Sequence, residues 1–116
     1  MLFNFGGFLR PIDPFPMLNI ATGGSSVPVK FSLSGNKGLN IIAPGYPAST
    51  QIACNDNEPG STVEETTANG SGLTYDDASD QYIYVWKTTK EWKGTCRIFI
   101  LKLVDGREYY AKFRFR

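Results

Sequence analysis

The chain has 116 residues, of which 41% are hydrophobic and 14% aromatic, and its 12 basic and 11 acidic residues give a formal net charge of +1. This composition is typical of a single globular domain spanning residues 1–116, and it excludes a disordered chain. A nearly neutral charge argues against a nucleic-acid partner. The lack of any apolar run of about 18 residues argues against direct membrane insertion.

Short extended stretches recur along the chain, separated by Gly and Pro, and no window has helical periodicity. We expect an all-β fold, an immunoglobulin-like antiparallel β-sandwich of about seven to eight strands. The likeness to an immunoglobulin domain concerns architecture only, because Trp86 and Trp92 lie close to the second cysteine instead of following the first. The extended stretches are residues 2–8, 17–21, 27–33, 39–43, 51–54, 63–67, 73–75, 81–87, 95–104 and 107–116.

The stretch 27–33 alternates between apolar and polar residues, which predicts a strand with one buried face. Pro28 and Lys30 fall on the other face. A proline and a lysine on one strand protect an exposed sheet edge from pairing with other chains. The alternative, in which Lys30 forms an isopeptide crosslink, requires an inward side chain and is disfavoured by the alternation.

The clearest turn is Asp105-Gly106, a strong hairpin signal between two long extended stretches. Pairing across a two-residue turn places Ile98 opposite Phe113 and Cys96 opposite Phe115. These side chains share a mostly apolar face, which we expect to be the core.

Cys54 and Cys96 are the only cysteines, and neither has the spacing of a zinc site. A disulfide and two buried thiols are both open at this point. If Cys96 points inward, a bridge to Cys54 would pin two sheets together.

Histidine is absent, which removes the commonest general base and nucleophile activator. We therefore expect no enzyme activity and no cofactor. The only metal candidates are Asp76, Asp77 and Asp80, which could offer oxygen ligands to calcium. A hydrogen-bonded Asx turn between two strands is the competing interpretation.

Aromatic residues recur near the end of the chain, and they allow two readings. Tyr82, Tyr84 and Trp86 could join Trp92 in an exposed platform that binds sugar rings. Alternatively the rings belong to the core, where large aromatic side chains usually lie.

The tetrapeptide Pro28-Val29-Lys30-Phe31 lies within VPVKFSLSGNKGLNI, and APGYPAS, IAC, GSGLTYDDASDQYIYVWKT, WKGTCRIFILKLVDG and YAKFRF follow. These motifs resemble those of the PxKF domain of bacterial secreted and cell-surface proteins. With FNFGGFLRPID near the start, the resemblance covers nearly the whole chain. It implies an extracellular β-sandwich module, usually one unit of a longer protein, with a Cys54–Cys96 disulfide. It implies no ligand, because no activity is established for the family.

We therefore expect a non-catalytic structural or interaction module, extracellular or on the cell surface, whose partners are other protein domains or copies of itself. In one variant, the stretch carrying Phe3, Phe5 and Phe8 adds as a strand to a neighbouring subunit. The alternative is a carbohydrate-binding module that contacts polysaccharide through the aromatic residues above.

Overall fold

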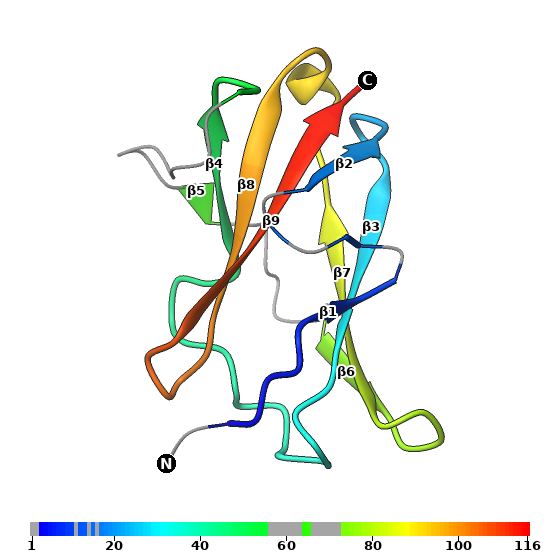
Figure 1. Cartoon of the computed structure of the whole chain (residues 1–116), viewed down its shortest axis with the longest axis vertical. Coiled ribbons are helices and arrows are strands. Elements are labelled where there is room, and N and C mark those ends of the chain that lie inside the picture. Colours follow the sequence, from blue (N-terminus) through cyan, green and yellow to red (C-terminus); the bar gives the residue numbers. More distant parts are fainter. Residues whose placement is uncertain (1–2, 11, 14, 16, 56–63, 66–72) are drawn as a thin grey trace.

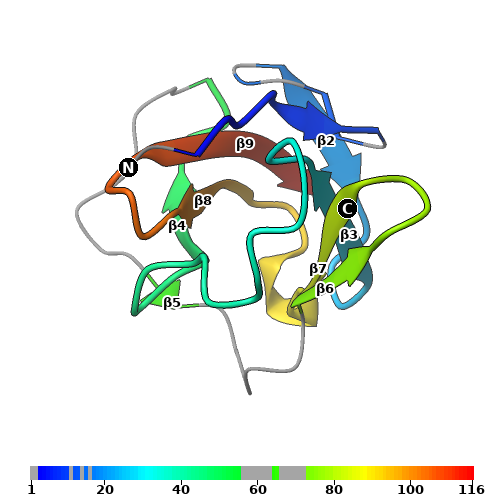
Figure 2. The same ribbon diagram turned by 90° about the horizontal axis from the view of Figure 1, so that it is seen from below.

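The computed structural model describes residues 3–10, 12–13, 15, 17–55, 64–65 and 73–116. Within these ranges the chain forms two packed sheets and a single short 3-10 helix, η1 (Lys90–Trp92) (Figures 1 and 2). One sheet has the order β1 (Phe8–Leu9), β3 (Ser26–Phe31), β7 (Gln81–Lys87), β6 (Leu73–Asp76). The other has the order β2 (Leu18–Ala21), β9 (Glu108–Phe115), β8 (Cys96–Lys102), β4 (Ala48–Ile52), β5 (Glu64–Glu65). The expected all-β sandwich is confirmed.

Two of the predicted strands are much shorter than the sequence suggested. The first is reduced to Phe8–Leu9, and the stretch 39–43 contributes only an isolated bridge between Ile42 and Leu103. Of the stretch 63–67, the described part is β5, and the rest lies outside the described residues.

The expectation of a purely antiparallel sandwich is wrong at one strand. β2 runs parallel to β9, whereas all other described pairs are antiparallel. The chain pairs with β3 at Phe8–Leu9 and with β9 at Leu18–Ala21, so it changes sheets between them. Three prolines occur in this connection. Because proline cannot donate to a ladder, the segment cannot continue as one long strand.

The interior between the sheets is aromatic and centred on Trp86, which is fully buried. Its ring centroid lies 4.8 Å from that of Phe99, 5.1 Å from Phe113 and 5.8 Å from Phe115. These rings come from both sheets, so their packing joins the two layers. Burial of each such side chain stabilises the fold by about 1.5–3 kcal/mol.

The predicted register of the last hairpin is wrong by one residue. Ile98 pairs with Lys112, and Arg97 pairs with Phe113. The loop has three residues instead of two, because the Leu103 N–H bonds to the Arg107 carbonyl. A left-handed glycine, Gly106 at φ 94°, closes this loop, as in three-residue hairpins.

This shift of one residue reverses the expected face of β8. Phe113 points into the interior between the sheets, whereas Ile98 and Cys96 are buried on the opposite face of the five-stranded sheet. Both faces of β8 are therefore apolar, which is why the sequence pattern did not distinguish them.

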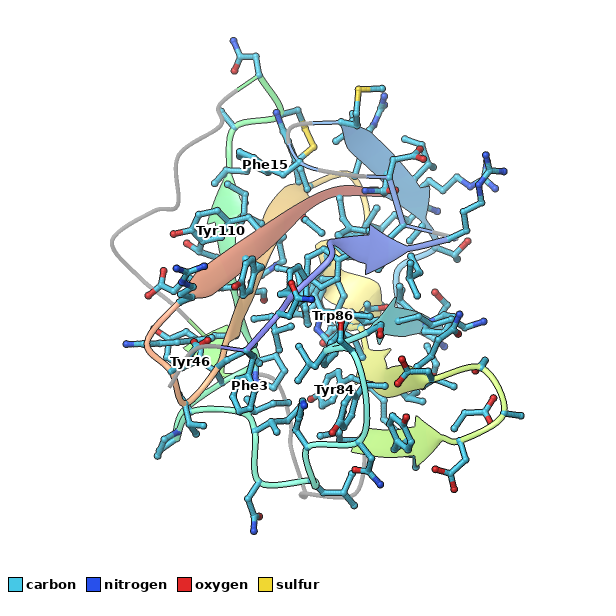
Figure 3. The ribbon with its side chains drawn as sticks, turned by 60° about the horizontal axis from the view of Figure 1, so that its bottom comes forward. Phe3, Phe15, Tyr46, Tyr84, Trp86 and Tyr110 are labelled. Carbon is cyan, nitrogen blue, oxygen red and sulfur yellow. A yellow bond between two sulfur atoms is a disulfide. The ribbon has the colours of Figure 1, made fainter. Side chains whose placement is uncertain are left out.

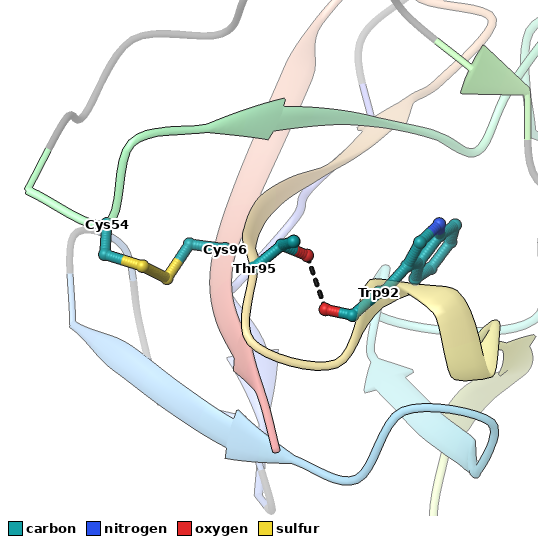
Figure 4. The surroundings of a disulfide bond; sticks show 4 residues. All are labelled: Cys54, Trp92, Thr95 and Cys96. Carbon is teal, nitrogen blue, oxygen red and sulfur yellow. Dashed lines mark hydrogen bonds between the residues drawn. A yellow bond between two sulfur atoms is a disulfide. The ribbon is translucent and has the colours of Figure 1, made fainter.

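The expected Cys54–Cys96 disulfide is confirmed, with its Cα atoms 5.1 Å apart (Figure 4). The bridge does not pin two sheets together. Cys54 follows β4 and Cys96 begins β8, and these strands are neighbours in the same sheet. The two residues are 42 positions apart, a loop whose closure stabilises the fold by about 4 kcal/mol when chain entropy alone is considered.

Candidate functional site

The free side of β2 is the candidate site, and the backbone hydrogen bonds of β2 define it. Arg116 donates its N–H to the Ala21 carbonyl at 2.9 Å and accepts the Gly23 N–H at 3.0 Å. In a parallel ladder, bonded residues alternate along each strand. The backbone groups of Asn19 and Ala21 therefore face β9.

By the same alternation, the N–H and C=O groups of Leu18 and Ile20 face away from β9. None of these four groups bonds to another described residue. β2 is thus a sheet edge with a row of unpaired donors and acceptors, which is the pattern that another strand can bind.

The side chains of β2 have an inverted pattern, with apolar residues outside. Leu18 is 38% exposed, Ile20 is 53% exposed, and the preceding Met17 is 58% exposed. The polar Asn19 is only 7% exposed.

Asn19 can be buried because its amide is fully engaged. It accepts the Asp13 N–H at 2.8 Å and donates to the carbonyls of Asp13 at 3.3 Å and Lys112 at 3.1 Å. These bonds fix the entry of β2 against β9 and leave Leu18 and Ile20 on the outer face.

The edge of β3 lies across the opening from β2 and is protected in the way the sequence predicted. The Thr88 N–H donates to the Ser25 carbonyl, so the alternation of an antiparallel ladder turns Ser26 and Pro28 away from β7. Pro28 has no N–H to offer on that side. Lys30 faces outward, and its backbone position is paired with Leu9 of β1.

A groove of about 410 Å³ runs between these two edges. Ile12 and Val27 contribute apolar surface to it, and Asn19 lies at its base. Asp13 is the only charged residue among the described groove-lining residues. Its carboxylate makes no hydrogen bond or ion pair with any described residue.

The predicted metal candidates serve as turn residues instead. Asp76 accepts the Ala78 N–H and the Ser79 hydroxyl, which is the Asx turn offered as the alternative. Asp77 contacts neither Asp76 nor Asp80 through a hydrogen bond. Among the residues that the structure describes, no group of three or more His, Cys, Asp or Glu side chains could hold a metal ion.

Asp80 anchors the loop after β3 to the turn before β7. It accepts the Tyr75 hydroxyl at 2.6 Å, the Gly35 N–H at 3.1 Å and the Ser32 hydroxyl at 3.3 Å. The Tyr75 hydrogen bond is the main cause that lowers the pKa of Asp80, and the same bond raises the pKa of Tyr75 to about 12.

The exposed aromatic platform proposed from the sequence is wrong for three of its four residues. Tyr82, Tyr84 and Trp86 are buried, so they cannot contact a surface ligand. Figure 3 shows Tyr84 and Trp86 among the other side chains of the interior. Trp92 is half-buried against Trp86, and the guanidinium of Arg97 covers its ring at 4.0 Å. The alternation of residues 81–87 placed these rings on one face correctly, but that face is the core.

The N-terminal aromatic residues are used within the chain. Phe8 belongs to β1, which pairs with β3, and the ring of Phe5 stacks on Tyr109 at 3.8 Å. Phe3 is half-buried against the core, and its N–H donates to Asp105 at 3.0 Å. Assembly through this stretch would therefore require its exchange between copies.

A smaller aromatic pocket of about 250 Å³ lies beside the start of β9. Phe5, Phe15 and Tyr110 contribute rings to it, and Tyr110 donates its hydroxyl to the Glu108 carboxylate at 2.8 Å. That hydrogen bond is the main cause that raises the pKa of Tyr110. Figure 3 shows Phe15 and Tyr110 close together, away from the buried Trp86.

Searches with the whole sequence and with the structure matched no family model, no curated protein and no solved structure. No described helix has the length and apolar character needed to cross a bilayer. The disulfide is typical of proteins that reside in an oxidising compartment.

Sequence reasoning missed the β2 edge. The signal was present in residues 17–21, MLNIA, where a single polar residue sits among apolar ones. Because both faces of this short strand carry apolar residues, the sequence alone does not show which face is buried.

Proposed function

We propose that this chain is a non-catalytic module of an extracellular or cell-surface bacterial protein, and that its role is to bind segments of other proteins. The resemblance to PxKF domains and the disulfide support the exported setting. The absence of histidine supports a role without acid–base chemistry.

An immunoglobulin-like topology is part of this proposal, and the strand orders support it. The order β1-β3-β7-β6 corresponds to A-B-E-D, and β9-β8-β4 corresponds to G-F-C. The disulfide departs from the antibody pattern, because it joins neighbours in one sheet and not two facing sheets.

The observation that carries a binding role is the unpaired, apolar edge of β2. Single exposed apolar residues are common on protein surfaces. Here Leu18 and Ile20 occur together on a strand whose outward backbone groups are also unpaired, and the exposed Met17 directly precedes them. An apolar edge of this kind associates with other chains unless it is protected or already has a partner.

The test is to present the immobilised chain with a phage-displayed random heptapeptide library and, separately, with a panel of insoluble polysaccharides. We expect specific peptides to be enriched and no polysaccharide to be retained. Failure to enrich any peptide over a bead control would contradict a protein-binding role.

Carbohydrate binding remains the second candidate function. The aromatic pocket beside β9 is the better site for it, because the rings of Tyr82, Tyr84 and Trp86 are buried. Half-buried rings of Phe15 and Tyr110 next to the Glu108 carboxylate combine a ring face with hydrogen-bonding groups. In the polysaccharide panel, retention of wild type that is lost in Tyr110→Ala but kept in Trp92→Ala would establish this pocket as the site. Retention of neither wild type nor variants would exclude it.

A further inference from the structure

We propose that β2 binds an extended segment of another protein, which adds beside it as a new edge strand and directs a basic side chain toward Asp13. This inference rests on the proposed protein-binding role and specifies the surface and the kind of partner.

The backbone of β2 selects an extended partner. The outward groups of Leu18 and Ile20 are two donors and two acceptors spaced two residues apart. A strand presents its backbone groups at the same spacing, so a short extended segment can pair with all four. A helical partner cannot, because its own backbone bonds are already made within the helix.

The side chains of the added strand would alternate between two surfaces. Those on the outer face would lie beside Leu18 and Ile20 and cover their exposed apolar groups. Those on the inner face would enter the groove toward Val27. At about 410 Å³ the groove lies within the range of roughly 300–1,000 Å³ typical of ligand clefts.

The charge of the groove specifies the partner further. The Asp13 backbone is held by the Asn19 amide, which fixes the position from which its carboxylate projects. That carboxylate has no partner among the described residues and is the only charge among those lining the groove. A lysine or arginine on the inner face of the added strand would pair with it.

A second copy of this chain fits the edge less well. Antiparallel pairing of β2 with the same strand of another copy would set Leu18 opposite Ile20 and centre the pair on Asn19. Because the Asp13 backbone is bonded to the Asn19 side chain, this pairing would bring the two Asp13 residues near each other, and their like charges would repel. A foreign basic segment avoids that repulsion.

The experiment uses peptides selected from the heptapeptide library, measured by fluorescence anisotropy with the whole chain. Binding should weaken at least about tenfold in Ile20→Pro, which removes one outward N–H and its hydrogen bond. The matched control Ile20→Val keeps the N–H and an apolar side chain, and should bind like wild type. In Asp13→Asn, the preference for peptides with a central lysine over their alanine versions should disappear.

A second measurement avoids any change to the protein. Methylating alternate backbone amides of the selected peptide should abolish binding for one of the two alternating sets and leave it nearly unchanged for the other, because only one side of a strand faces β2.

Four outcomes separate the possibilities. Sensitivity to Ile20→Pro and to one methylation set supports the proposal. Peptides that bind equally to wild type and Ile20→Pro and tolerate both methylation sets would place the binding elsewhere, so the protein-binding role would stand and this inference would fail. No enriched peptide would overturn both. A dimer seen by sedimentation and lost in Ile20→Pro would make a second copy the occupant and would overturn the foreign segment.

Discussion

Two sheet edges border the same groove, and the chain treats them differently. Along β3, Pro28 faces outward without an N–H, Lys30 keeps the outer face charged, and β1 covers the end of the strand. Along β2, Leu18 and Ile20 leave donors, acceptors and apolar side chains open together. Both edges belong to the same small domain, so solubility alone does not explain the contrast.

The difference indicates that edge protection in this chain is selective. A strand that carries only a structural role is blocked by proline, charge or a covering segment. The unprotected strand is therefore the better candidate for a binding surface, and this contrast locates it without any catalytic motif.

Both edges depend on the aromatic core, so we expect a substitution in the core to cause the largest loss of stability. Trp86→Ala should lower the free energy of unfolding by about 3–5 kcal/mol, because it leaves a cavity among Phe99, Phe113 and Phe115. Chemical denaturation with far-UV circular dichroism measures the change. Trp92→Ala, which removes a half-buried ring, should cost clearly less, and an equal loss would contradict a core centred on Trp86.

The disulfide links the ends of β4 and β8 in the five-stranded sheet, and β2 lies at the edge of this sheet away from the bridge. Replacing both Cys54 and Cys96 by alanine should cost about 2–4 kcal/mol through the unfolded state. Reductant should produce the same shift in wild type and none in the double variant. Unchanged stability in both cases would show that the bridge contributes nothing to this fold.

Proline substitutions at two neighbouring positions of β2 should differ in how much they destabilise the fold. Ala21→Pro removes an N–H that faces β9 and should cost about 1–3 kcal/mol, because the Arg114 carbonyl loses its donor. Ile20→Pro removes an outward N–H and should cost under about 1 kcal/mol. If the two variants were equally destabilised in thermal melts, the assigned direction of the β2 backbone groups would be wrong.

We expect the smallest effect on stability from the turn at Asp80, which holds the loop after β3. The lowered pKa of Asp80 means that its contribution to stability is present above its usual pKa and is lost as the pH falls through the lowered value. Because the pKa of Tyr75 is raised to about 12, its protonated hydroxyl stabilises the fold below its usual pKa near 10. This contribution to stability is lost as the pH rises from about 10 to about 12. Tyr75→Phe should remove the high-pH loss and weaken the low-pH one. A phenolate titration near pH 10 at Tyr75 would contradict the hydrogen bond to Asp80.

Features that depend on local periodicity were predicted correctly from the sequence. The alternation in β3 and β7 gave the outward Lys30 and the shared face of Tyr82, Tyr84 and Trp86. Composition and spacing also gave the all-β class.

The sequence could not determine features that depend on long-range packing. A loop longer by one residue at Asp105-Gly106 shifted the β8–β9 register, and the two apolar faces of β8 gave no sign of the error. The burial of Asn19 depends on Asp13 and on Lys112, which is 93 residues away in sequence, so the open face of β2 was invisible before the fold was known.

Amide hydrogen exchange of the free chain, resolved by residue with NMR, tests the open edge of β2 most directly. We expect slow exchange at Asn19 and Ala21, whose N–H groups face β9, and fast exchange at Leu18 and Ile20, which become protected when a selected peptide binds. Equal protection at all four amides in the free chain, or no change at Leu18 and Ile20 on binding, would contradict an open pairing edge.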